Sequence, residues 1–132
     1  MTRRAEGFFR QGEEELTPAP RLRIGVGFGP GRIAAFTAVL DTGSDLCVFP
    51  VEAFEKMGLD EPPAFREVRG FDGTSSEAPA YYPSITAGDL RERGVEAILL
   101  PGVEPLVGRN FLNRFRVLLD SSEDLVTVEI PE

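Results

Sequence analysis

The sequence predicts a mainly β domain in which short strands form a closed, barrel-like sheet together with one or two short helices. Two observations support this fold class. The 132 residues include 14 Gly and 11 Pro, a content that favours many turns over long helices. Short segments in which apolar and polar residues alternate recur along the chain, as expected for strands with one buried face. Because 42% of the residues are hydrophobic, one packed core is possible, and we expect a single domain over residues 21–132.

Residues 1–20 precede this domain, and we expect them to form a flexible arm. Three consecutive glutamates occupy positions 13–15, and Pro18 and Pro20 follow in a polar stretch. Phe8 and Phe9 are the two side chains of this arm that could dock on the domain.

The first hairpin of the domain is predicted over residues 21–40. Apolar residues alternate with Arg or Gly from 21 to 28, a period of two that is typical of a half-buried strand. Residues 29–32 contain two glycines and a proline and predict a turn, and the apolar run 33–40 predicts a more fully buried strand. Asp41 directly follows the second strand of this hairpin.

The elements after Asp41 follow from turn signals and periodicity. A short helix is expected over residues 50–57, because Pro50 suits the first helical position and Gly58 can end the helix. A second short helix is expected over 108–115, where three apolar residues have helical spacing. Asp72-Gly73 predicts a hairpin tip. Further strands are expected at 46–49, 65–69, 74 onward, 85–90, 95–100 with a turn at 91–94, 117–119 and 125–130.

The composition excludes several classes of function. The net charge is -8, which argues against a nucleic-acid partner. The chain has no histidine, so Ser–His and Cys–His pairs and most zinc sites are excluded, and we expect neither a metal nor a cofactor. Cys47 is the only cysteine; we interpret it as a small buried residue, and we expect a cytoplasmic protein without an internal disulfide. No apolar run approaches the roughly 20 residues that span a membrane, so no membrane partner is expected.

Asp41 is the first candidate for chemistry. It directly follows a buried strand, at a point where a carboxylate can be partly buried and still reach a ligand. Thr42 adds a hydroxyl group beside it, and Gly43 permits a tight turn. The alternative is an Asp-Thr-Gly turn with a purely structural role, since Asp and Gly are common turn residues.

The surroundings of Asp41 favour the functional interpretation. Residues 36–50, an apolar strand that leads into Asp-Thr-Gly-Ser and is followed by another apolar strand, resemble the active-site segment of aspartic peptidases. Residues 105–112 resemble the second motif of that family, two apolar residues and a glycine before a short helix. The predicted hairpin at 71–73 lies between them, where the family has its flap. With a single Asp-Thr-Gly, the match over about residues 20–130 is to the retropepsin-like, single-domain branch, whose members work as homodimers.

The resemblance implies an acid-protease fold and an aspartic endopeptidase that hydrolyses peptide or protein substrates as a homodimer. It assigns catalysis to Asp41 of each subunit and an ion pair near the substrate groove to Asp45 and Arg109. The residues that it assigns to supporting roles are Thr42, Gly43 and Ser44 in the active-site loop and Phe71, Asp72 and Gly73 in the flap. Two alternatives stay open: a dimeric peptide-binding scaffold of the same fold with little or no catalysis, and a monomeric ligand-binding barrel.

Overall fold

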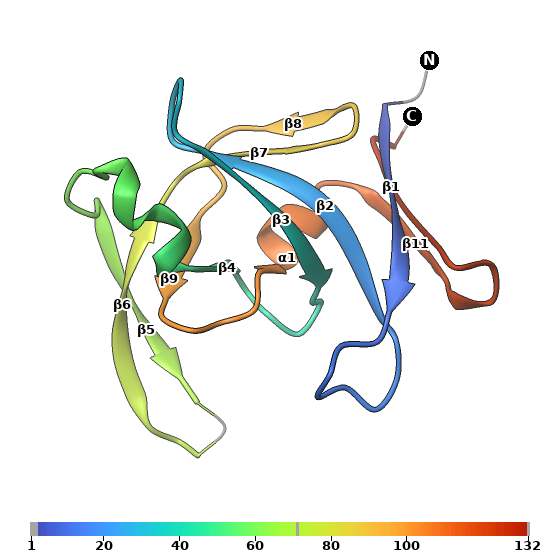
Figure 1. Cartoon of the computed structure of the whole chain (residues 1–132), viewed down its shortest axis with the longest axis horizontal. Helices are drawn as coiled ribbons and strands as arrows, with labels where there is room; N and C mark the ends of the chain where they lie inside the picture. The colour runs from blue at the N-terminus through green and yellow to red at the C-terminus, as the bar shows by residue number, and fades with distance from the viewer. Residues whose placement is uncertain (1–2, 71, 132) are drawn as a thin grey trace.

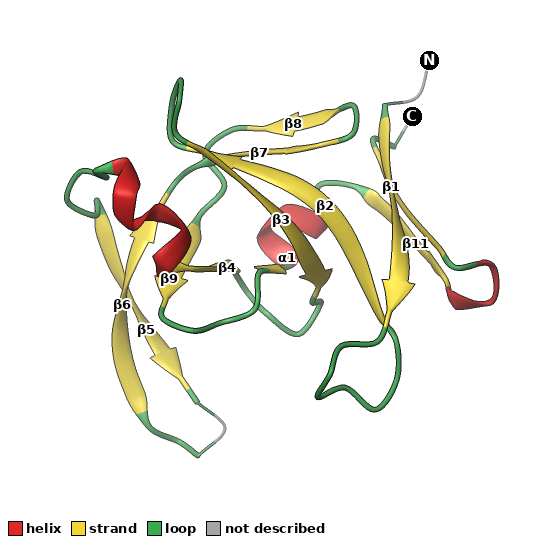
Figure 2. Cartoon of the chain, viewed as in Figure 1, coloured by secondary structure: helices red, strands yellow, loops and turns green. Residues whose placement is uncertain are grey.

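The computed structural model describes residues 3–70 and 72–131 and consists mainly of short strands (Figures 1 and 2). The strands are β1 (Arg4–Arg10), β2 (Ala19–Gly27), β3 (Ile33–Leu40), β4 (Cys47–Pro50), β5 (Ala64–Arg69), β6 (Ser75–Tyr81), β7 (Ser84–Ala87), β8 (Leu90–Glu92), β9 (Ala97–Leu100), β10 (Leu106–Val107), β11 (Arg116–Asp120) and β12 (Leu125–Glu129). The helices are the 3-10 helices η1 (Val51–Met57) and η2 (Ser121–Glu123) and the single-turn α1 (Arg109–Leu112). No helix in the described part of the chain has the length and apolar character needed to cross a membrane.

The strands form one sheet in the order β11-β12-β1-β2-β3-β10-β4-β9-β6-β5. Outside this order, β7 pairs with β2, and β8 pairs with β7. The prediction of a mainly β fold is confirmed, but closure of the barrel is not, because the sheet is open. Its end strands β5 and β11 lie on opposite sides of the molecule (Figure 1). Most side chains of β5 are exposed, so this strand lacks the apolar face that would hold it against the other end of the sheet.

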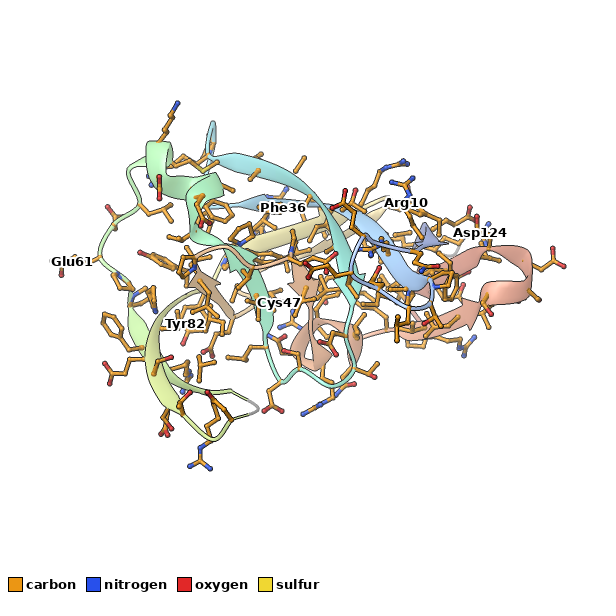
Figure 3. The ribbon with its side chains drawn as sticks, turned by 60° about the horizontal axis from the view of Figure 1, so that its bottom comes forward. Arg10, Phe36, Cys47, Glu61, Tyr82 and Asp124 are labelled. Carbon is orange, nitrogen blue, oxygen red and sulfur yellow. The ribbon has the colours of Figure 1, made fainter. Side chains whose placement is uncertain are left out.

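The core lies where the predicted alternation places it. Leu22, Ile24 and Val26 of β2 are at most 4% exposed, whereas Arg23 between them is exposed. The largest fully buried side chains include Phe49, Phe54 and Phe111. In Figure 3, Phe36 and Cys47 lie in the middle of the molecule and Glu61 at its outer edge. This core fixes β3 and β4, the two strands that flank Asp41.

Strand β1 differs from the flexible arm expected over residues 1–20. Its first half, residues 4–7, pairs with β12, and its second half, residues 8–10, pairs with β2. The loop that follows is also tied to the domain, because Glu15 and Glu104 both form ion pairs with Arg21, whose side chain is only 7% exposed. Local composition did not predict the strand because its main partner, β12, lies at the other end of the chain.

Strand β8 is the second difference. The sequence predicted strands at 85–90 and 95–100 around a turn at 91–94, whereas the chain turns after β7 at Gly88 and returns as β8. Gly88 has a φ of 51°, and a Cβ atom there would lie 2.8 Å from the carbonyl oxygen of Arg4. The turn therefore depends on a close approach to β1 that the local sequence does not reveal. The β2–β3, β5–β6 and β11–β12 hairpins and the short helices η1 and α1 lie at the predicted places.

Candidate active site

Asp41 lies at the end of β3, in the loop that leads to β4, and hydrogen bonds fix both its backbone and its side chain. Its amide donates to the carbonyl oxygen of Val107 at 2.9 Å, and its own carbonyl accepts from the amide of Ser44 at 3.2 Å. Its Oδ1 accepts from the amide of Gly43 at 2.9 Å. Asp41 is half-buried, and Thr42 and Gly43 are exposed. The carboxylate is thus held in one orientation at the surface of the domain.

Strand β10 brings the second motif against this loop. It pairs parallel to β3 and antiparallel to β4, so it lies between the two strands that carry the loop. Gly108 follows it, and a Cβ atom at this position would lie 2.3 Å from the carbonyl oxygen of Leu46 and 2.9 Å from that of Ser44. Only glycine permits this approach. The next two amides donate to the loop, Arg109 to the Ser44 carbonyl at 2.8 Å and Asn110 to the Asp45 carbonyl at 3.2 Å.

Arg109 and Asp45 form the ion pair that the sequence predicted. The guanidinium group of Arg109 binds Asp45 Oδ1 and also donates to the carbonyl oxygen of Thr42 at 2.7 Å. The side chains are 41% and 86% exposed, so the attraction between the two charges is weakened by solvent. The fork of the guanidinium acts mainly as a brace, because it joins two points of the loop to α1.

A groove of about 410 Å³ lies between the active-site loop and β5. One wall consists of loop residues 43–46, and the other consists of residues 66–69 of β5. Leu46, Val68 and Ile98 supply apolar surface in the groove. Ile98 belongs to the small core cluster beneath the β5–β6 hairpin, and Leu46 and Val68 pack against that cluster. The sequence predicted the loop wall but not Val68 and Ile98, since it could not show which strand faces the loop.

The tip of the β5–β6 hairpin is a tight turn, as predicted. Asp72 accepts hydrogen bonds from the amide of Thr74 at 3.0 Å and from its hydroxyl at 2.7 Å. These bonds hold the pKa of the Asp72 carboxyl below its usual value. Gly73 has a φ of 83°, which suits glycine. Phe71, the third predicted flap residue, lies outside the described residues.

A family model described as "Aspartyl protease" matches residues 27–111, a span that contains Asp41, the hairpin tip and Arg109. The chain belongs to the aspartyl protease family. A crystal structure titled as a retropepsin-like aspartic protease from Rickettsia conorii superimposes with a TM-score of 0.65 at 17% identity, over 98% of this chain and 94% of that one. No curated protein shows significant similarity to the chain. The retropepsin-like resemblance stated from the sequence is confirmed.

Cys47 has a structural role in this aspartyl protease. It is fully buried at the start of β4, and its Sγ donates to the side-chain oxygen of Asn110 at 3.5 Å. Burial raises the pKa of the thiol to about 11, so it stays protonated at neutral pH. The interpretation of Cys47 as a small buried residue is therefore confirmed. Within the described residues, no group of three His, Cys, Asp or Glu side chains could hold a metal ion.

Proposed function

We propose that the chain is an aspartic endopeptidase that works as a homodimer, with Asp41 of each subunit in one shared active site. The observation that supports this most directly is the position of Asp41. Its carboxylate is oriented by the Gly43 amide, its loop is braced by Arg109, and a groove opens along the same loop. A turn with a purely structural role would not need the brace or the groove.

The chemistry requires two carboxylates. Hydrolysis of a peptide bond needs a base that takes a proton from the attacking water and an acid that gives a proton to the scissile carbonyl oxygen. Two facing carboxylates hold one proton between them, because like charges a few Å apart cannot both ionise; this behaviour is well known for aspartic proteases. The ionised Asp41 would take the proton from water as the oxygen attacks, and the protonated Asp41 of the other subunit would give its proton to the carbonyl oxygen.

The tetrahedral intermediate then collapses. Its C–N bond breaks as the carboxyl that took the proton from water gives it to the leaving nitrogen, and the other carboxylate takes a proton from a hydroxyl of the intermediate. The products are a carboxylic acid and an amine. The dyad ends with one proton, as it began, so no metal or cofactor enters the step. The sequence contains one Asp-Thr-Gly, and a two-fold axis beside Asp41 supplies the second carboxylate from an identical chain. The exposure of Thr42 and Gly43 leaves the loop accessible to that second copy.

We propose an extended peptide as the substrate. Among the described residues, β5 pairs only with β6, so its outer edge can hydrogen-bond to an added strand beside the groove. The same edge supports the second candidate function, a dimeric scaffold that binds peptides without cleaving them. Binding alone would use β5 and the groove but would not depend on the charge of Asp41.

Cleavage of a mixed peptide library between about pH 4 and pH 7 tests the proposal. We expect Asp41→Asn to lower cleavage by about 10²- to 10⁴-fold while the dimer survives in sedimentation. Asp60→Asn, an exposed aspartate outside the active-site loop, is the matched control and should cleave normally. Equal cleavage by wild type and Asp41→Asn would overturn the catalytic assignment, and peptide binding without cleavage by the wild type would favour the scaffold.

A further inference from the structure

A hollow of about 300 Å³ opens on the solvent-facing side of β2, near the turn between β2 and β3. This β2 hollow is formed by that turn and by four strands that pair side by side in the order β3-β2-β7-β8 (Figure 1). It shares no lining residue with the groove between the active-site loop and β5. Asp41 follows the opposite end of β3. The β2 hollow is therefore separate from the candidate active site.

The strand register explains why the sheet is hollow at this point. Gly25 of β2 lies opposite Thr86 of β7. Gly27 lies opposite Ser84 of β7 and, on its other side, Ile33 of β3. Residues that lie opposite each other in an antiparallel pair project to the same face, so two positions without side chains separate Ile33 from the hydroxyl groups of β7. A Cβ atom at Gly25 would lie only 2.7 Å from Oγ1 of Thr86, so the two glycines form the floor and the neighbouring side chains border it.

The two walls of the β2 hollow differ in chemistry. On the side of β3 the wall is apolar, and it consists of Pro30 and of Ile33, whose side chain is 64% exposed. On the opposite side are the hydroxyl groups of Ser84 and Thr86. Beyond them lies Arg91 of β8, which is opposite Thr86 in the register. Small-molecule sites typically combine apolar surface with a few polar groups at one end, as this hollow does.

Arg91 gives the β2 hollow a positive charge that no acid balances. No Asp or Glu side chain lines the hollow. Within residues 3–70 and 72–131, none of the ion pairs involves Arg91, although the chain carries a net charge of -8. The planar guanidinium group can donate two parallel hydrogen bonds to a carboxylate. The charge of the hollow is therefore complementary to a carboxylate ligand.

We propose that the β2 hollow binds a small apolar carboxylate. The apolar body lies over Gly25 and Gly27 against Ile33, and the carboxylate accepts hydrogen bonds from Arg91 and from the two hydroxyl groups of β7. At about 30 Å³ for each water-sized group, the volume holds roughly ten non-hydrogen atoms. An inorganic anion would leave the apolar wall unused, and an uncharged apolar molecule would leave Arg91 unused. The proposal does not depend on the peptidase function.

Titration followed by amide NMR spectra tests the site. Phenylacetate has the required size, and phenylacetamide is its uncharged control of the same shape. We expect phenylacetate to shift the amide signals of Gly25, Gly27, Ser84 and Thr86 at low ionic strength, with a Kd of about 1 mM. Phenylacetamide should bind about tenfold more weakly, because it cannot form the charged hydrogen bonds to Arg91.

Two variants separate the charged end of the site from its apolar wall. Arg91→Gln should weaken the binding of phenylacetate about tenfold and leave that of phenylacetamide unchanged. Ile33→Thr keeps a β-branched residue in β3 but should weaken the binding of both compounds about threefold. Arg93→Gln and Ile130→Thr are the matched controls, since both positions are exposed and lie outside the hollow. The variants replace exposed side chains, so Tm should change little.

A carboxylate on an apolar body occurs in free small acids and in the C-terminal residue of a peptide. A comparison of hydrocinnamate with N-acetylphenylalanine, which adds a peptide group to the same acid, distinguishes the two sources. Tighter binding of N-acetylphenylalanine in the β2 hollow would support the proposal with a peptide C-terminus as the ligand. Tighter binding of hydrocinnamate would support it with a free acid.

The proposal is supported if the shifts at β2 and β7 depend on both the carboxylate and Arg91. It is overturned if these signals do not move up to about 20 mM phenylacetate, or if the acid and its amide bind equally well. Wild-type affinity for phenylacetate in Arg91→Gln would also overturn it. Shifts at Gly43 and Leu46 in place of those at β2 would put the acid in the active-site groove and would contradict a separate site.

Discussion

Replacement of Gly108 by alanine should damage the active-site loop more than any other part of the molecule. The added Cβ would lie 2.3 Å from the carbonyl oxygen of Leu46, so the loop and the start of α1 must separate by roughly 1 Å. Such overpacking costs about 1–3 kcal/mol. The separation also stretches the hydrogen bonds from the Arg109 and Asn110 amides to the loop, at about 1 kcal/mol each. We expect a loss of about 2–5 kcal/mol in the free energy of unfolding, and a roughly 10²-fold loss of kcat from the displaced carboxylate.

Thermal unfolding and peptide cleavage, measured at one protein concentration, check both numbers. Gly27→Ala is the mild control, because its Cβ would lie 3.4 Å from a side-chain carbon of Ile33, an ordinary contact. Gly7→Ala is the severe control: its Cβ would lie 2.0 Å from the Arg21 carbonyl oxygen, in β1 and outside the loop. It should lower Tm but leave kcat unchanged where the protein is folded. A Gly108→Ala protein with wild-type Tm and kcat would refute the reasoning, as would an equal loss of kcat in Gly7→Ala.

Three further predictions follow from individual side chains. Because burial raises the pKa of Cys47 to about 11, a thiol reagent at about pH 8 should label it only in denaturant. The stability that its neutral form contributes should persist below about pH 8.5 and decline as pH rises toward 11. Fast labelling of the native protein would contradict this. The pKa of Asp72 is lowered by hydrogen bonds from Thr74, so its contribution to the hairpin tip should be present above about pH 4 and lost as pH falls through the lower folded value. The protection of the Thr74 amide against hydrogen exchange, relative to the intrinsic rate at each pH, should therefore fall in acid and in Asp72→Ala at neutral pH. Arg109→Lys keeps the positive charge but loses the forked guanidinium group, so kcat should fall about tenfold. Tm should change little, since exposed ion pairs such as the one with Asp45 contribute about 0–1 kcal/mol. An unchanged kcat would exclude the role of Arg109 as a brace.

Local patterns predicted the part of the fold that carries Asp41. Strand β3 occupies the predicted range 33–40 because an apolar run bounded by a glycine-rich turn leaves few other conformations. The prediction that it is more fully buried was wrong, because only Ala38 and Leu40 of this strand are buried and Ile33 is 64% exposed. The hairpin tip at Asp72-Gly73 was equally local, since its turn is stabilised by its own side chains and by Thr74. The ion pair between Asp45 and Arg109 could be predicted only through the family resemblance, because 64 positions separate the two residues.

The features that the sequence did not predict depend on contacts between distant segments. Strand β1 combines charged and small residues with Phe8 and Phe9, shows no clear alternation, and becomes a strand through β12 and β2. The turn at Gly88 depends on the backbone of β1 passing within contact distance. The groove wall formed by Val68 depends on how the β5–β6 hairpin lies against the loop. Periodicity describes which face of a strand is buried, but it does not name the neighbour that buries it.

The split pairing of β1 has a consequence for the order in which the chain folds. The half of β1 at residues 8–10 meets its partner as soon as β2 exists, whereas the half at residues 4–7 must wait for β12. Contacts between such distant segments form late, because closing the long stretch of chain between them costs entropy before the contacts can stabilise the fold. Strand β11 is held in the sheet by β12 and is therefore completed in the same late step. Residues 4–7 are therefore among the last parts of the sheet to form, although β1 precedes every other strand in the sequence.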